Sequence, residues 1–190
     1  MMRRLLYVLT ALLLVACNAE QQYSTRYPCS FVFYAKDHIN TNALTISLSN
    51  PGQFVIVEPK QVNGLTHLML TPNSGTWETF QTDIPLSASA IENERLSYDH
   101  MGACKRLIIG TSNFNGLKAY DGQCPNCLES DGALWHPLSW TDKGQMLVCE
   151  HCQRKYNPHA EGVPVNGKEG DLRLMEYRIE YNGQRLYVHN

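Results

Sequence analysis

The chain has 190 residues, of which 43% are hydrophobic and 18% are charged, and its formal net charge is −2 at pH 7. This length is enough to bury a sizeable core and is typical of one domain with a small subdomain. Basic residues do not form a stripe interleaved with aromatic residues, so nucleic-acid binding is not expected.

The N-terminus has the pattern of a secretory signal. A basic head at residues 1–4 precedes an apolar run at 5–15, which is too short to span a bilayer as a helix. The run ends in Leu14-Val15-Ala16-Cys17, with a small residue before the expected cleavage point. One interpretation is an ordinary signal peptide with an incidental cysteine. The other is a lipoprotein signal, because these four residues resemble the bacterial lipobox.

The lipobox resemblance implies that residues 1–16 are removed and that Cys17 becomes the first mature residue and carries lipid. The polar segment that follows predicts a tether, so we divide the chain into a signal at 1–16, a tether at 17–29 and a domain at 30–190. The expected location is the cell envelope, with the domain outside the cytoplasm. Asn18 after the lipidated cysteine favours the outer membrane if the envelope has two membranes.

Short apolar segments separated by turn signals predict a mostly β fold. The predicted strands lie at 30–34, 43–48, 54–57, 67–70, 106–109, 118–120 and 146–148, with a final hairpin at 174–188. The dipeptides Asn63-Gly64, Asn115-Gly116 and Asn182-Gly183 predict tight hairpin turns. A long loop is expected at 71–89, and one or two helical turns are expected at 91–98.

Two CxxC pairs carry most of the chemical information. They are Cys124-Pro-Asn-Cys127 and Cys149-Glu-His-Cys152, with 21 residues between the inner cysteines. Each pair can turn two thiolates toward one point, so the two pairs together predict a tetrahedral four-sulfur metal site. Two disulfides are the alternative reading, because an exported protein meets an oxidising environment. A thiol–disulfide redox protein is a further alternative, although the strand-to-helix pattern of thioredoxin-like CxxC motifs is missing.

The remaining cysteines and the nearby histidines have more ordinary explanations. Cys29 and Cys104 are either joined as a disulfide or buried as two free thiols. His136, His151 and His159 are expected to lie at the surface or beside the metal ligands rather than to bind the metal.

Residues around the cysteines suggest no enzyme of a familiar class. The sequence lacks a nucleophile elbow, a His-Glu-x-x-His motif, a phosphate-binding loop and a dinucleotide fingerprint. Acidic residues near the cysteines, Asp121 and Asp131 among them, are expected to be solvated loop charges. Trp135, Trp140 and Tyr156 are expected to form hydrophobic packing. The chain is therefore not expected to be a hydrolase or a transferase, whereas electron transfer stays open.

The second half of the chain resembles the Rieske iron–sulfur domain over about residues 106–190. The residues that carry the resemblance are Ala119-Tyr120-Asp121, Cys124-Pro125, Leu147-Val148-Cys149, Tyr156, Gly162, Val163-Pro164-Val165, Leu174 and the closing hairpin. The resemblance implies an antiparallel β-sandwich with a small metal-binding subdomain at about 122–158, in which each cysteine pair lies at the tip of a loop.

The ligands depart from the Rieske pattern, which uses two cysteines and two histidines. Cys124 and Cys149 match the family's cysteines, but Asn126 and Cys152 occupy the places of its histidines, and Cys127 supplies a fourth thiolate. The export signal is typical of a chain that crosses the membrane unfolded, so its metal would be acquired outside the cytoplasm. Zinc is therefore favoured over mononuclear iron and over a four-cysteine [2Fe–2S] cluster.

These patterns together predict a lipid-anchored envelope protein that holds one metal centre on Cys124, Cys127, Cys149 and Cys152. Zinc bound by four thiolates has no open coordination position and cannot activate water. The zinc would therefore be structural, in a module that binds or assembles with a protein partner whose identity the sequence does not give. The alternative is an electron-transfer protein with an iron centre on the same four residues.

Overall fold

The computed structural model describes residues 23–38, 42–74, 81–86, 100–132 and 135–190. The predicted signal, Cys17 and the predicted helical turns at 91–98 lie outside these ranges. Within them, none of the helices is both long enough and apolar enough to cross a membrane.

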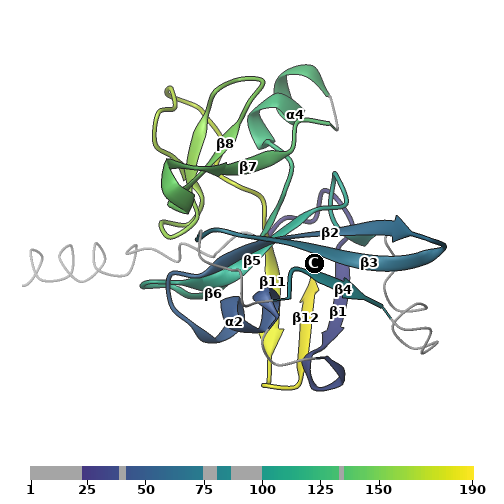
Figure 1. Ribbon diagram of the computed structural model, residues 1–190. Helices are drawn as coiled ribbons and strands as arrows, with labels where there is room; N and C mark the ends of the chain where they lie inside the picture. Colours follow the sequence, from purple (N-terminus) through teal and green to yellow (C-terminus); the bar gives the residue numbers. More distant parts are fainter. Residues whose placement is uncertain (1–22, 39–41, 75–80, 87–99, 133–134) are drawn as a thin grey trace, which may run out of the picture.

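The chain is mostly β, as the sequence predicted, and its main element is one curled antiparallel sheet (Figure 1). The eight strands lie in the order β1-β12-β11-β6-β5-β2-β3-β4. Their bounds are β1 Ser30–Tyr34, β2 Phe54–Val62, β3 Leu65–Pro72, β4 Asp83–Pro85, β5 Leu107–Ser112, β6 Gly116–Asp121, β11 Glu176–Tyr181 and β12 Arg185–His189.

All three predicted Asn-Gly turns are confirmed as hairpin turns. Between β2 and β3, Asn63 and Gly64 adopt φ values of 52° and 81°, the left-handed pair that a two-residue hairpin requires. Gly116 opens β6 after the β5–β6 loop with φ 66°, and Gly183 lies between β11 and β12 with φ 84°.

The predicted strand at 43–48 is wrong, because this segment forms the helix α2 (Ala43–Ser49). Asn42 caps the helix by accepting a hydrogen bond from the Thr45 backbone N–H at 2.9 Å. Leu44 and Leu48, four residues apart, are both buried on the face that packs against the sheet. A six-residue apolar pattern fits either period, and the cap decides in favour of the helix.

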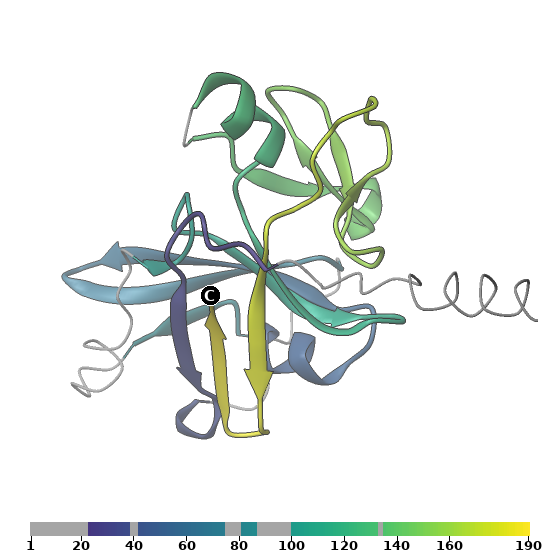
Figure 2. The same ribbon diagram turned by 180° about the vertical axis from the view of Figure 1, so that it is seen from behind.

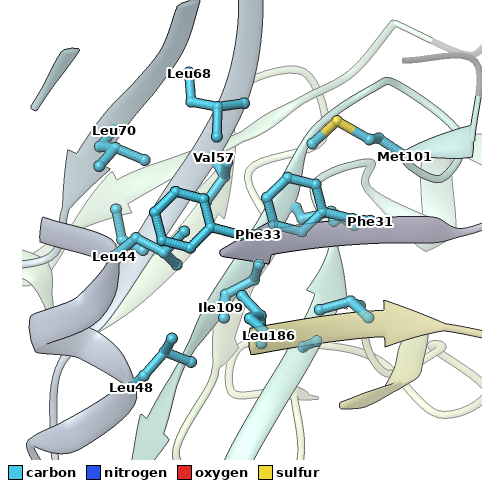
Figure 3. Packing of buried hydrophobic residues seen from close by; sticks show 14 of the residues in the cluster. Phe31, Phe33, Leu44, Leu48, Val57, Leu68, Leu70, Met101, Ile109 and Leu186 are labelled. Atoms are coloured by element: carbon cyan, nitrogen blue, oxygen red, sulfur yellow. The ribbon is translucent and has the colours of Figure 1, made fainter. Parts of the chain in front are cut away.

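The main sheet separates two hydrophobic cores. Val55, Val57 and Ile109 face the inside of the curl, where they pack with Phe31, Phe33 and other residues from β1, β3, β12 and α2 (Figure 3). The alternate residues Phe54, Ile56 and Ile108 face the opposite side and belong to the second core. Residues 54–57 of β2 and 107–109 of β5 are therefore buried on both faces, which explains their continuous apolar runs.

The second core lies under a small lobe that is inserted between two paired strands. Strands β6 and β11 are neighbours in the main sheet, and residues 122–175, here called the inserted lobe, connect them. The lobe contains α4 (Pro125–Asp131) and a second sheet in the order β10-β9-β8-β7, seen at the top of Figures 1 and 2. Its strands are β7 Leu138–Thr141, β8 Met146–Cys149, β9 Lys155–Asn157 and β10 Val163–Pro164. Two 3-10 turns are η1 Ala35–Asp37 and η3 Asp142–Gly144.

Asp121 fixes the point where the lobe leaves the sheet. It was expected to be a solvated charge, which is wrong, because it is fully buried at the end of β6. Its carboxylate accepts hydrogen bonds from the Ala103 and Gln123 backbone N–H groups and from the Tyr177 hydroxyl, at 2.7–2.8 Å. Burial raises the pKa of Asp121, while these donors oppose the rise by stabilising the charge.

The described part of the predicted tether lies against the domain. The Ser24 backbone N–H donates to the Glu176 carbonyl at 2.7 Å, and Arg26 pairs with Glu129 of α4 at the same distance. Cys29 is buried and pairs with Met101 in a β-bridge.

Candidate metal centre

The four predicted ligands come from two neighbouring turns of the inserted lobe. Cys124 occupies the position just before α4, and Cys127 lies in its first turn. Cys149 ends β8, and Cys152 lies in the turn that leads to β9.

Helix α4 was missed by the sequence analysis, although its two ends are marked in the sequence. Pro125 occupies the first turn, where its missing N–H costs nothing. Gly132 ends the helix in the left-handed conformation at φ 65°, a position that favours glycine. Proline followed seven residues later by glycine is the signal that would have identified this helix.

The four sulfurs converge on one point. All of them lie within 4.8 Å of one another, and two contacts between the turns measure 3.7 Å for Cys124–Cys152 and 3.6 Å for Cys127–Cys149. A tetrahedral site with Zn–S bonds of about 2.3 Å has edges of about 3.8 Å. The four cysteines are free thiols, because their sulfur separations are far longer than the S–S bond length of about 2.05 Å. The group could therefore hold a metal ion, and the disulfide alternative is not what the structure contains.

Hydrogen bonds to sulfur repeat in the two pairs. In each CxxC the backbone N–H of the second cysteine donates to the sulfur of the first. The Tyr156 hydroxyl lies 3.2 Å from the Cys124 sulfur. Donors aimed at sulfur stabilise a thiolate, so both turns are arranged to hold the charged form that binds metal.

The thiols differ in acidity because they share these hydrogen bonds unequally. The bond from the Cys149 thiol, and next that from Tyr156, lowers the pKa of Cys124 to about 4 against the effect of burial. The pKa of Cys149 is raised, first because it donates to Cys124 and then because it is buried. Burial raises the pKa of Cys127 to about 12. Metal binding must therefore displace protons from Cys127 and Cys149.

Asn126 supports the site from the first turn of α4. Its amide donates to the Tyr156 hydroxyl at 2.8 Å and to the Leu172 carbonyl at 3.0 Å, and it accepts from the Leu172 N–H at 2.9 Å. The hydroxyl accepts from Asn126, so its own proton is free to point at the Cys124 sulfur. The sequence analysis missed this role for Asn126.

A cation also lies beside the sulfurs. Arg154 forms two hydrogen bonds with the Asp171 carboxylate, at 2.8 and 2.9 Å, and its guanidinium also hydrogen-bonds the Cys152 sulfur. These bonds lower the pKa of Asp171 to about 2. Four thiolates around a divalent ion carry a net charge of −2, which Arg154 partly offsets. Nothing in the spacing of Arg154 and Asp171 marks them in the sequence.

The three histidines contact aromatic or acidic side chains. His136 and His151 stack on each other with ring centroids 4.0 Å apart, and His151 lies 3.5 Å from Asp131. His159 packs edge-on against Phe54. Within the described residues, the four-sulfur group contains no imidazole nitrogen.

Of the three aromatic residues expected to form packing, Tyr156 is fully buried and Trp140 packs against the second core. The expectation is wrong for Trp135, whose surface is 73% exposed.

Cys29 and Cys104 are buried free thiols outside the centre. The Cys29 sulfur contacts the Val188 carbonyl at 3.7 Å, and the Cys104 sulfur contacts Asp121 at 3.9 Å. Burial raises the pKa of Cys29 to about 12, which makes it a poor nucleophile.

The chain was compared with known families, proteins and structures. No family model, curated protein or solved structure matches the chain.

Proposed function

We propose that this protein is a lipid-anchored component of the cell envelope whose Rieske-like domain binds one structural zinc ion through Cys124, Cys127, Cys149 and Cys152. The observation that carries the proposal is the convergence of four sulfurs, all within 4.8 Å of one another, from two turns of the inserted lobe.

The sulfur separations favour a single ion over a two-iron cluster. In a [2Fe–2S] cluster the four thiolates are divided between two irons, so sulfurs on opposite irons are farther apart than the edge of one tetrahedron. Here all four sulfurs lie within 4.8 Å of one another, and contacts of 3.6 and 3.7 Å join one turn to the other. That arrangement fits one tetrahedral ion between the turns.

A structural role follows from the closed ligand set and from the size of the lobe. Four protein ligands leave a tetrahedral zinc ion no position for water or substrate. The strands of the small sheet have two to four residues each, and such short strands stabilise a fold weakly. One ion that joins α4 to the β8–β9 turn supplies the missing stability, and the rigid lobe then serves as a binding or assembly module.

Electron transfer through a mononuclear iron at the same site is the second candidate. Two observations favour it, namely the partial exposure of Cys152 and the guanidinium of Arg154 at its sulfur. Exposure gives an electron a short path to a partner, and a nearby cation stabilises the reduced, more negative state.

Metal analysis of protein purified after native export tests both candidates. One zinc per chain and no visible absorption are expected, whereas a red iron–thiolate spectrum would replace zinc with the electron-transfer alternative. Absence of any metal together with Cys124–Cys127 and Cys149–Cys152 disulfides would overturn both.

The anchor is tested separately with Cys17→Ser. This variant is expected to lose incorporation of labelled fatty acid and to leave the membrane fraction. The domain should still fold, because Cys17 precedes it. Equal labelling of the variant and the wild type would remove the lipid anchor from the proposal.

A further inference from the structure

A second group of metal-ligating side chains lies beside the four cysteines. Asp131, His136 and His151 bring one carboxylate oxygen and two imidazole nitrogens to within 4.8 Å of one another. They come from three segments, since Asp131 ends α4, His136 precedes β7 and His151 lies in the turn between Cys149 and Cys152.

We propose that Asp131, His136 and His151 form a second, exchangeable site for a divalent ion of the Zn²⁺ class. Two imidazoles and a carboxylate are ligands that Zn²⁺ accepts, and three protein ligands leave a tetrahedral ion one open position. The site is therefore of a different kind from the closed four-thiolate centre.

The separation between His151 and Asp131 is compatible with metal binding. Their Nε2 and Oδ2 atoms are 3.5 Å apart, longer than the usual N–H···O distance of about 2.7–3.2 Å. Two ligands at bond lengths of about 2.0–2.2 Å around a tetrahedral ion are separated by about 3.4 Å. The observed distance thus fits the edge of a coordination tetrahedron better than a hydrogen bond.

The two imidazoles are placed together without a buried core to force them. Their ring planes are 16° apart at a centroid distance of 4.0 Å, and the His151 and Asp131 side chains are 55% and 44% exposed. An imidazole lone pair lies in the ring plane, so one ring must tilt out of the stack when an ion binds. Exposed side chains make that rotation inexpensive, and they allow the ion to enter from solvent.

A cavity of about 310 Å³ adjoins two of the three proposed ligands. His136 and His151 line it together with Trp135, Pro137 and Ser139. The cavity therefore has room for water or a small ligand at the open coordination position. The exposure of Trp135, which packing does not explain, places an aromatic face at the same cavity.

The backbone of each ligand is fixed by the four-cysteine centre. The His136 carbonyl accepts the Cys124 N–H at 2.9 Å, α4 carries both Cys127 and Asp131, and His151 lies between two cysteine ligands. The second site thus depends on the first for its geometry, whereas the first needs none of these three side chains. In that respect alone the inference rests on the proposed function.

The test is zinc stoichiometry of the full chain without a histidine tag, by titration and metal analysis. Wild type should bind two ions, of which a mild chelator removes one. Asp131→Asn, His136→Gln and His151→Gln should each lower the affinity for the removable ion by at least about tenfold, while the other ion stays bound. His67→Gln is the matched control, since His67 also pairs with an exposed aspartate, Asp83, at 2.6 Å, and this variant should bind as wild type does.

Substitution of Co²⁺ keeps the two hypotheses distinguishable, because sulfur-to-cobalt charge-transfer absorption reports only the thiolate centre. A single bound ion with that absorption would overturn the second site and leave the proposed function intact. Two ions in all three variants would place the second ion elsewhere and would also overturn the inference. Absence of the charge-transfer band would count against the proposed function instead.

Discussion

Removal of the Tyr156 hydroxyl should weaken metal binding without changing a ligand. The side chain is fully buried, and its hydroxyl accepts from Asn126 at 2.8 Å and points its proton at the Cys124 sulfur, 3.2 Å away. Burial raises the pKa of Tyr156, so the hydroxyl remains a donor across the accessible pH range. A hydrogen bond to a charged acceptor contributes about 1.5–3 kcal/mol. Tyr156→Phe should therefore lower zinc affinity by about 10- to 150-fold.

Tyr120 provides a matched control within the same core. It is also fully buried, but its hydroxyl donates to the Pro158 carbonyl at 3.2 Å and not to a sulfur. Tyr120→Phe should cost about 1 kcal/mol of unfolding free energy and leave zinc affinity unchanged. Competition with a chromogenic chelator measures affinity, and thermal unfolding of the metal-loaded protein measures stability. Equal affinities for Tyr156→Phe and Tyr120→Phe would refute a specific hydrogen bond to the thiolate.

Three further results are expected. Serine at any of the four ligands, Cys124, Cys127, Cys149 or Cys152, should abolish stoichiometric metal binding and cost several kcal/mol of lobe stability. The controls Cys29→Ser and Cys104→Ser should retain the metal, and metal analysis measures both outcomes. Zinc uptake at pH 7 should release at least two protons, because the pKa of Cys127 is about 12 and that of Cys149 is raised. Zinc affinity should therefore increase with pH. Calorimetry in two buffers of different ionisation enthalpy measures the proton release, and finding none would contradict this prediction. Gly144→Ala should lower the unfolding free energy measured with denaturant by about 2–4 kcal/mol, since at φ 80° its Cβ would lie 1.3 Å from the Asn73 carbonyl oxygen. The control Gly183→Ala, at φ 84° with no atom within 4 Å of its Cβ, should lower it by about 1 kcal/mol.

Local signals in the sequence predicted the parts of the fold that depend on local chemistry. Asn-Gly turns specify positive φ at defined positions, so the three hairpins could be placed from sequence. The CxxC pairs could be matched with each other for a similar reason, since a metal site constrains which residues must meet. Leu44, Ile46 and Leu48 led to a wrong strand prediction, because a short apolar run fits both the strand and the helix period. The N-cap residue Asn42 is the local signal that marks the helix.

Roles that depend on tertiary contacts could not be predicted in the same way. Asp121 looked like a loop charge because its donors, Ala103, Gln123 and Tyr177, gather only in the folded chain. Arg154 and Asp171 are 17 residues apart and meet only because the chain returns past the cysteines. The grouping of Asp131 with His136 and His151 likewise follows from three backbone segments that the four-cysteine turns bring together.

The second core links the candidate metal centre to the main sheet. Cys124, Cys127 and Cys149 belong to the same buried cluster as Phe54, Ile56 and Ile108, which are the outward faces of β2 and β5. If the lobe loosened, these three side chains would lose their cover, although the opposite faces of both strands would still be packed inside the curl. Exposed apolar surface of this kind is unfavourable by roughly 25 cal/mol per Å². Metal binding in the lobe would therefore also stabilise the sheet that carries it, through the packing of this second core.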